Sequence, residues 1–99
     1  MKLKKIGNED LKFLEYIDLK ELKELDLYHN NISDIRVLEK VKFEKLEKLY
    51  LNWNKISDIE IFKKVKFEKL KILNLEKIVF NKNYSFIYYL QSKYKLYIK

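Results

Sequence analysis

The sequence predicts an α/β solenoid, with a short parallel sheet on the concave face and short helices on the convex face. Residues 22–45 and 46–69 align without a gap and are identical at fourteen of 24 positions. Each copy contains an alternating apolar segment, typical of a strand, followed by apolar residues three apart, typical of a short helix. The turns are formed without proline and with one glycine in the whole chain. Self-similarity at a fixed period of this length indicates stacked repeats.

Length and composition indicate one small domain. The chain has 99 residues, of which 47% are hydrophobic, and this is enough to bury a core. We expect a single domain over residues 1–99. It would consist of an N-terminal partial repeat at 1–21, full repeats at 22–45 and 46–69, and a divergent C-terminal repeat and cap at 70–99.

Each full copy carries the pattern L-x-x-L-x-L-x-x-N-x-I. The pattern is formed by Leu22, Leu25, Leu27, Asn30 and Ile32, and again by Leu46, Leu49, Leu51, Asn54 and Ile56. On these residues the chain resembles the leucine-rich repeat family, and its N-x-I-S-D-I run is similar to the internalin-like class. The resemblance implies a right-handed solenoid in which Asn30 and Asn54 bond the backbone of the neighbouring turn as an inner ladder. It leaves the binding target to the residues between the leucines.

The first two predicted elements lie in the N-terminal partial repeat. Residues 1–21 superpose on the first full repeat at the same 24-residue offset. This predicts a strand near 2–4 and a helix near 9–17. Ile6 replaces the ladder asparagine, a departure that is typical of a terminal repeat.

The full repeats predict strands near 24–28 and 48–52, and convex helices near 34–41 and 58–65. Stacking gives each strand a neighbour about 4.8 Å away to pair with.

Polar residues before the two convex helices predict how those helices begin. Ser33 is a candidate N-cap, and Ser57 with Glu60 predicts a capping box. Asp34 and Asp58 fall in the first turn, where the helix dipole favours an anion.

The C-terminal repeat departs from the pattern after its strand, which is predicted near 72–76. Ile78 replaces the ladder asparagine, so the ladder is expected to end at Asn54. A helix near 84–92 and a last strand near 95–98 should follow, one residue earlier than the repeat requires. Five tyrosines should cover the core edges with their hydroxyls in water: Tyr84, Tyr88, Tyr89, Tyr94 and Tyr97.

The net charge of +7 allows a nucleic-acid or acidic-protein partner. However, the lysines are scattered and Arg36 is the only arginine, whereas phosphate and base recognition relies more on arginine. The chain has no cysteine, no apolar run of membrane-spanning length and no secretory signal at its start. We therefore expect a cytoplasmic protein that does not enter a membrane.

The chemistry-bearing residues do not form a recognisable catalytic or metal site. His29 is the only histidine, and there is no glycine-rich phosphate loop. Glu24 and Asp26 share a strand face, but Lys48 on the next strand predicts solvated ion pairs there. We expect no enzymatic activity, no cofactor and no bound metal.

The strand residues that do not enter the core predict a binding surface on the concave face. Aromatic side chains surrounded by charges are typical of protein-binding surfaces. The predicted partner-binding residues are Tyr28, His29, Tyr50, Trp53, Ile72, Glu24, Asp26, Lys48 and Asn74. In the alternative interpretation, Trp53 folds over its own turn and shields Ile56 or the ladder.

These observations favour a non-enzymatic adaptor or inhibitor that docks its concave face on another protein. Small size and a lysine-rich composition also suit a phage or mobile-element inhibitor of a bacterial effector enzyme. The alternative is a nucleic-acid-binding protein, in particular an RNA-binding one, that uses the net positive charge. We expect a monomer, with dimerisation through the open edge of the last strand as the alternative.

Overall fold

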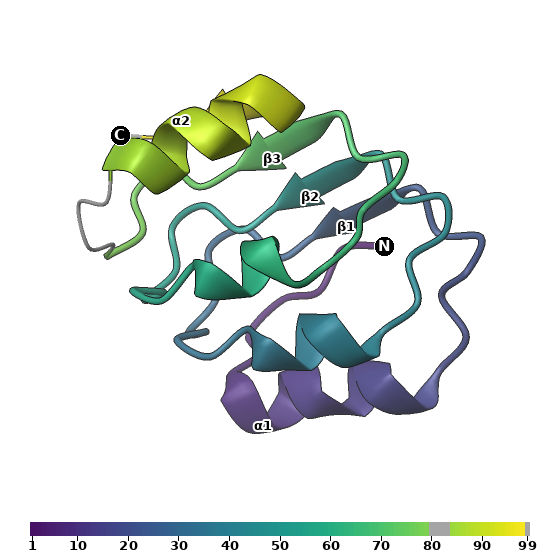
Figure 1. The fold of residues 1–99 in the computed structure, drawn as a ribbon. Coiled ribbons are helices and arrows are strands. Elements are labelled where there is room, and N and C mark those ends of the chain that lie inside the picture. The colour runs from purple at the N-terminus through teal and green to yellow at the C-terminus, as the bar shows by residue number, and fades with distance from the viewer. Residues whose placement is uncertain (80–83, 99) are drawn as a thin grey trace.

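The computed structural model describes residues 1–79 and 84–98, and in them short parallel strands form one sheet. Its strands are β1 (Glu24–Asp26), β2 (Lys48–Tyr50), β3 (Ile72–Asn74) and β4 (Lys95–Tyr97), and they lie in chain order. Figure 1 shows successive strands side by side, with each crossover returning on the same side of the sheet. The predicted α/β solenoid is confirmed.

The strand register confirms the repeat alignment. Leu25 pairs with Leu49, Leu49 with Leu73, and Leu73 with Leu96. The last step is one residue shorter than the others, as the sequence predicts. Because side chains alternate along a strand, this register places the leucines of neighbouring strands on one face of the sheet.

The strands are shorter than predicted, with three residues each. The parallel ladder nevertheless continues beyond β1, where the His29 N–H donates to the Asn52 carbonyl over 3.0 Å. The expected strand at 2–4 is reduced to an isolated bridge between Lys2 and Asp26. Lys5 has φ 57°, and this left-handed conformation turns the chain away from the sheet.

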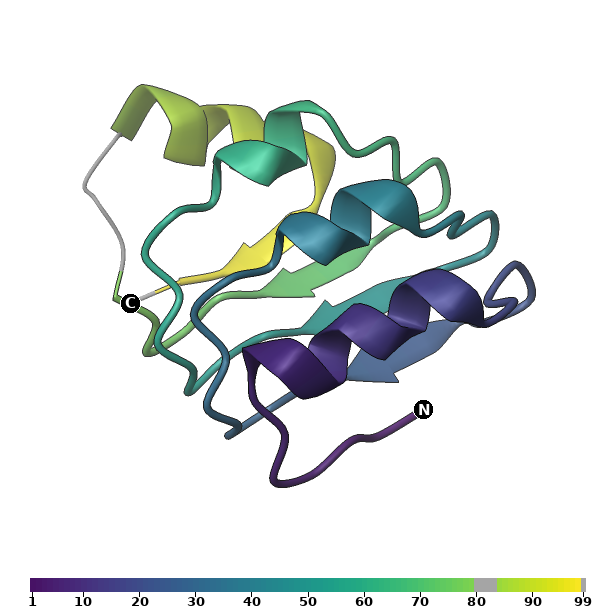
Figure 2. The same cartoon turned by 90° about the horizontal axis from the view of Figure 1, so that it is seen from below.

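The convex side is formed mostly by single helical turns. It contains α1 (Asn8–Leu11), η1 (Lys12–Tyr16), η2 (Arg36–Lys40), η3 (Glu60–Lys63) and α2 (Tyr84–Lys93), where η denotes a 3₁₀ helix. Figure 2 shows these elements stacked in the same order as the strands. The helices of the full repeats are shorter than predicted and of the 3₁₀ type, since apolar residues three apart match three residues per turn.

The predicted serine caps are wrong, and aspartates take their place. The Asp34 Oδ1 accepts the Arg36 N–H over 3.0 Å, and the Asp58 Oδ1 accepts the Glu60 N–H over 2.9 Å. The two helices begin later than predicted, so the serines lie too far upstream to cap them. Ser33 instead accepts a bond from the Asn8 Nδ2 over 2.8 Å, which joins neighbouring repeats.

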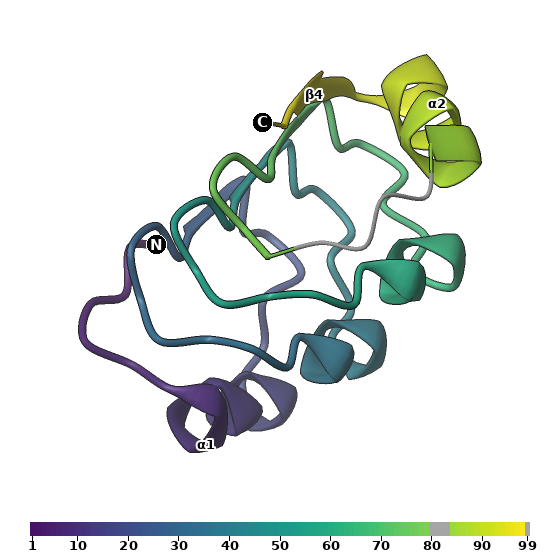
Figure 3. The ribbon, with the colours of Figure 1, turned by 90° about the vertical axis from the view of Figure 1, so that its left-hand side faces the viewer.

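The apolar core lies between the sheet and the helices. Figure 3 shows the helices spread more widely than the strands, so the sheet forms the inner, concave side. Leu25, Leu49 and Leu73 are fully buried, and each such side chain contributes about 1.5–3 kcal/mol. The Phe43 and Phe67 rings lie 5.8 Å apart and are buried in the same core.

The tyrosines of the C-terminal repeat divide into two groups. Tyr84, Tyr88, Tyr89 and Tyr97 are exposed, as predicted. Tyr94 contradicts the prediction because it is buried and its hydroxyl has no hydrogen-bond partner within residues 1–79 and 84–98. It follows α2 directly, where the chain turns inward to begin β4. Burial accordingly raises the pKa of the Tyr94 hydroxyl.

Candidate protein-binding face

The turns that follow the strands share an unusual backbone conformation. Lys5, His29, Trp53 and Lys77 have φ between 54° and 59° and are spaced by 24 residues. Non-glycine residues pay about 1–2 kcal/mol for this left-handed conformation. The repeated geometry bends the chain sharply after each strand and presents the side chains of this position at the rim of the sheet.

Asparagine side chains hold these turns together, which confirms the predicted ladder. The Asn54 Oδ1 accepts the Ile32 N–H over 3.1 Å, and its Nδ2 donates to the Leu27 carbonyl over 2.8 Å. Asn54 is 5% exposed. These bonds therefore replace the hydrogen bonds to water that its amide loses on burial. Asn30 makes the equivalent bonds to the Ile6 N–H and the Leu3 carbonyl, both over 3.0 Å. The rim is thus fixed by hydrogen bonds between neighbouring repeats.

Six of the predicted partner-binding residues form two rows across the sheet. Glu24, Lys48 and Ile72 occupy one row, and Asp26, Tyr50 and Asn74 occupy the next. Residues of one row are direct neighbours on adjacent strands. The structure therefore brings these six residues together on the concave face.

The remaining predicted residues, Tyr28, His29 and Trp53, follow the strands at the rim. The Tyr28 and His29 rings are 5.7 Å apart. Trp53 is 52% exposed and Tyr28 42%, so about half of each of these side chains is open to solvent. Tyr50 and Ile72 are half-buried. Together with Tyr50, the rim aromatics form a partly exposed patch, which we call the aromatic patch: Tyr28, His29, Tyr50 and Trp53.

Two of the polar site residues also shape the turns. The Asp26 Oδ1 accepts the Tyr28 N–H and the Asn74 Oδ1 accepts the Glu76 N–H, each over 3.0 Å. These bonds orient the chain as it leaves β1 and β3, in the manner of an Asx turn. Asp26 and Asn74 consequently contribute to the shape of the face as well as to its polarity.

The ion pair on this face differs from the predicted one. The expected pairing of Lys48 with Glu24 or Asp26 is absent from the part of the chain that the structure describes. Instead the Lys2 Nζ lies 4.0 Å from the Asp26 Oδ2. Lysine side chains are long and flexible, and an exposed pair of this kind contributes about 0–1 kcal/mol. Lys48 and Glu24 therefore remain exposed to solvent on the face.

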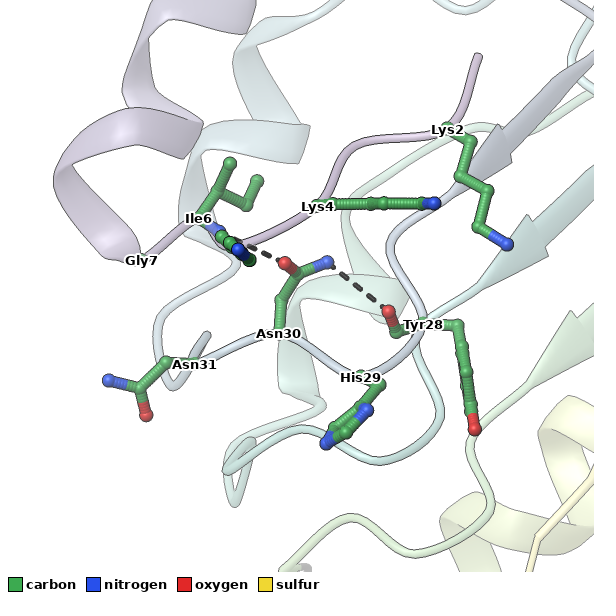
Figure 4. A pocket seen from close by; sticks show the side chains of 9 residues that line it. Lys2, Lys4, Ile6, Gly7, Tyr28, His29, Asn30 and Asn31 are labelled. Atoms are coloured by element: carbon green, nitrogen blue, oxygen red, sulfur yellow. Dashed lines mark hydrogen bonds between the residues drawn. The ribbon is translucent and has the colours of Figure 1, made fainter.

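A pocket of about 780 Å³ adjoins the aromatic patch at the N-terminal end of the sheet. Its lining residues are Lys2, Lys4, Lys5, Ile6, Gly7, Tyr28, His29, Asn30 and Asn31. Figure 4 shows Asn30 between the two turns that form its wall. The predicted site residues omit the three lysines. The 24-residue offset, which places Lys4 opposite Tyr28 and Lys5 opposite His29, is the signal that could have indicated them.

Neither a metal centre nor a membrane-spanning element was found in the residues that the structure describes. No group of three or more histidine, cysteine, aspartate or glutamate side chains could hold a metal ion within 1–79 and 84–98. No helix in these ranges has the length and apolar character needed to cross a membrane.

Comparison with known proteins agrees with the repeat architecture. The family model described as leucine-rich repeats (2 copies) matches residues 20–64. A search of curated proteins and a search of solved structures each gave no match. Repeats of this family generally mediate protein–protein interaction and are typically non-enzymatic. The matched segment contains β1, β2 and both ladder asparagines, and this part of the chain is thus built from leucine-rich repeats.

Proposed function

We propose that this protein is a non-enzymatic adaptor or inhibitor that binds another protein with its concave face. The aromatic patch carries this proposal. Tyr28 and Trp53 expose about half of their surfaces on turns that the asparagine ladder holds rigid. Exposed aromatic side chains on a rigid support lose little conformational freedom on binding, and such residues dominate the energy of protein interfaces.

The charges around the aromatic patch favour a protein partner over nucleic acid. Glu24, Asp26 and Glu76 lie on the concave face between the lysines, and they would repel a phosphate backbone that follows the sheet. A mixed set of charges around an aromatic centre sets the orientation of a protein partner instead. The small size and lysine-rich composition support the narrower proposal of a phage or mobile-element inhibitor that acts on a bacterial effector enzyme in the cytoplasm.

The test begins with capture of the partner from the native host and its identification by mass spectrometry. Binding of the purified partner is then compared between the wild type and the Tyr50→Ala plus Trp53→Ala double variant. We expect at least about a 30-fold loss of affinity, since central aromatic anchors contribute about 2–4 kcal/mol and each 1.4 kcal/mol is tenfold. Circular dichroism checks that the variant remains folded.

The matched control is Lys64→Ala plus Lys66→Ala, two exposed lysines on the convex side. This control should keep wild-type affinity for the partner. If the lysine variant loses binding while the aromatic variant keeps it, the concave-face proposal fails. A salt titration then tests nucleic acid, because binding to a phosphate backbone falls steeply as salt is raised.

We propose a monomer as the functional form. β4 is the last strand of the sheet and pairs with β3 on one side, and exposed Lys95 discourages pairing of its other edge with a second copy. Light scattering at high protein concentration checks this proposal, and a dimer lost on introducing proline within β4 would contradict it.

A further inference from the structure

The pocket beside the aromatic patch has a strongly biased charge. Lys2, Lys4 and Lys5 line it, and the lining contains no carboxylate. Lys2 has a partial counter-ion in Asp26, at 4.0 Å. Lys4 and Lys5 form no ion pair with any residue in 1–79 or 84–98. Several positive charges in one concave site focus the field and attract an anionic group.

The pocket is held open by the backbone, because two stacked turns form its wall. Lys5 and His29 occupy the left-handed position of successive turns. The Asn30 side chain joins these turns through its bonds to the Ile6 N–H and the Leu3 carbonyl, and Figure 4 shows the first of these bonds. A second link is the Asn31 N–H, which donates to the Ile6 carbonyl over 3.0 Å. A ligand therefore binds to a preformed site, and little conformational entropy is lost in ordering the backbone.

The lysine side chains lie next to the aromatic patch. Figure 4 shows Lys2 and Lys4 extending from the same side of the N-terminal segment, with Tyr28 and His29 on the adjoining turn. Tyr28 and His29 belong to both the pocket and the patch. A single partner can consequently occupy the two sites together.

We propose that this pocket receives the carboxylate side chains of an acidic segment in the partner protein. This inference rests on the proposed function. It specifies that the partner carries aspartate or glutamate residues next to the segment that covers the aromatic patch. The cationic pocket lies at one end of the sheet, and Glu24 and Asp26 follow immediately on β1. An anion with charges clustered over a few residues fits this arrangement, whereas a long phosphate backbone does not.

The pocket is tested with a synthetic hexaglutamate peptide, blocked at both ends, and with a hexaglutamine peptide of the same length as the neutral control. Amide NMR spectra of the labelled protein are followed during titration with each peptide. Hexaglutamate should shift the resonances of residues 2–7 and 28–31, and hexaglutamine should not. Lys4→Glu plus Lys5→Glu should weaken hexaglutamate binding at least tenfold.

The control variant is Lys64→Glu plus Lys66→Glu, which changes the net charge equally on the convex side. It should weaken binding less than about threefold, because exposed charges beyond a Debye length are largely screened at physiological salt. Equal losses in the two variants, or shifts spread over the convex lysines, would overturn the proposal. It would also be overturned if an octauridine RNA bound this pocket more tightly than hexaglutamate.

Failure of this inference can be distinguished from failure of the proposed function. The Tyr50→Ala plus Trp53→Ala variant should bind hexaglutamate like the wild type, since the peptide offers nothing to cover the aromatic patch. If the captured partner loses affinity for that variant but not for Lys4→Glu plus Lys5→Glu, the pocket assignment is wrong and the concave face remains the binding site. If neither variant loses affinity, both proposals fail.

Discussion

The turns after β2 and β3 have the same backbone bend but different side chains at its centre. Trp53 and Lys77 have φ 59° and 58°, yet the next residue is Asn54 in one turn and Ile78 in the other. Both of these residues are buried, with 5% and 9% exposed. The asparagine amide bonds the previous turn, whereas the isoleucine packs against the apolar core. The comparison indicates that stacking sets the path of the turn and that the asparagine satisfies the backbone groups enclosed by it.

The largest expected effect comes from removing the ladder at its most buried position. Asn54→Ala leaves the Ile32 N–H without its side-chain acceptor and removes one of the two asparagine donors to the Leu27 carbonyl, the other being Asn30. Unpaired buried polar groups cost about 1–3 kcal/mol each, and we expect a loss of unfolding free energy within about that range. Urea denaturation measures it.

The matched control for this measurement is Asn52→Ala in the same turn. The Asn52 Oδ1 is buried and makes no hydrogen bond among the described residues, so its removal should cost little. If Asn52→Ala destabilised the fold as much as Asn54→Ala, the ladder bonds would not explain the role of Asn54.

A smaller loss is expected for Asn30→Ala, about 1 kcal/mol. Asn30 makes the same bonds as Asn54 but is half-buried. Water can therefore reach the Ile6 N–H and the Leu3 carbonyl once the amide is gone. Measuring both variants by urea denaturation tests the ranking, and a larger loss for Asn30→Ala would contradict it.

Glycine at a left-handed position should stabilise the fold slightly. Lys77→Gly removes a side chain from a residue with φ 58°, and the relief of strain exceeds the entropy cost of glycine by up to about 1 kcal/mol. Lys55→Gly is the control, because Lys55 is an exposed turn lysine outside the left-handed set. Thermal melts should show a gain for the first variant and none for the second. A loss in both would mean that the left-handed turn is not strained.

The smallest effect should be a pH dependence in the first full repeat. Asp34 accepts bonds from the Arg36 guanidinium and from the Arg36 backbone, which lower the pKa of Asp34 from 3.8 to about 2. A lowered folded-state pKa adds stability above about pH 4, and this is lost as the pH falls toward 2. The pair is largely exposed, and screening limits its contribution to less than about 1 kcal/mol.

Asp34→Asn should accordingly destabilise the protein at pH 6 and make little difference at pH 2, as measured by urea denaturation at both values. Asp58→Asn is the matched control, since Asp58 occupies the same repeat position and Glu60 stands where Arg36 does. An equal pH-dependent loss in both variants would exclude the arginine as the cause.

Several features of the fold could be predicted because they depend on which residues occur and on their spacing along the sequence. The 24-residue period fixes which leucines share a row, and the one-residue shortening before β4 appears in the register. Asn30 and Asn54 could be assigned to the ladder because the repeat pattern resembles leucine-rich repeats, and the assignment is consistent with the need of a buried amide for hydrogen-bond partners. The two rows of side chains on the concave face follow from the same register, since side chains alternate across a strand.

Other features were decided only by the tertiary structure. The left-handed turns at His29 and Trp53 could not be predicted from the sequence, because non-glycine residues rarely adopt that conformation. The convex helix of the first full repeat begins at Arg36 rather than at residue 34, so Asp34, rather than Ser33, bonds its first N–H. The cationic pocket depends on the distance between two stacked turns, those that contain Lys5 and His29. The sequence by itself determined which residues share a face, and the packed turns decided where that face is hollow.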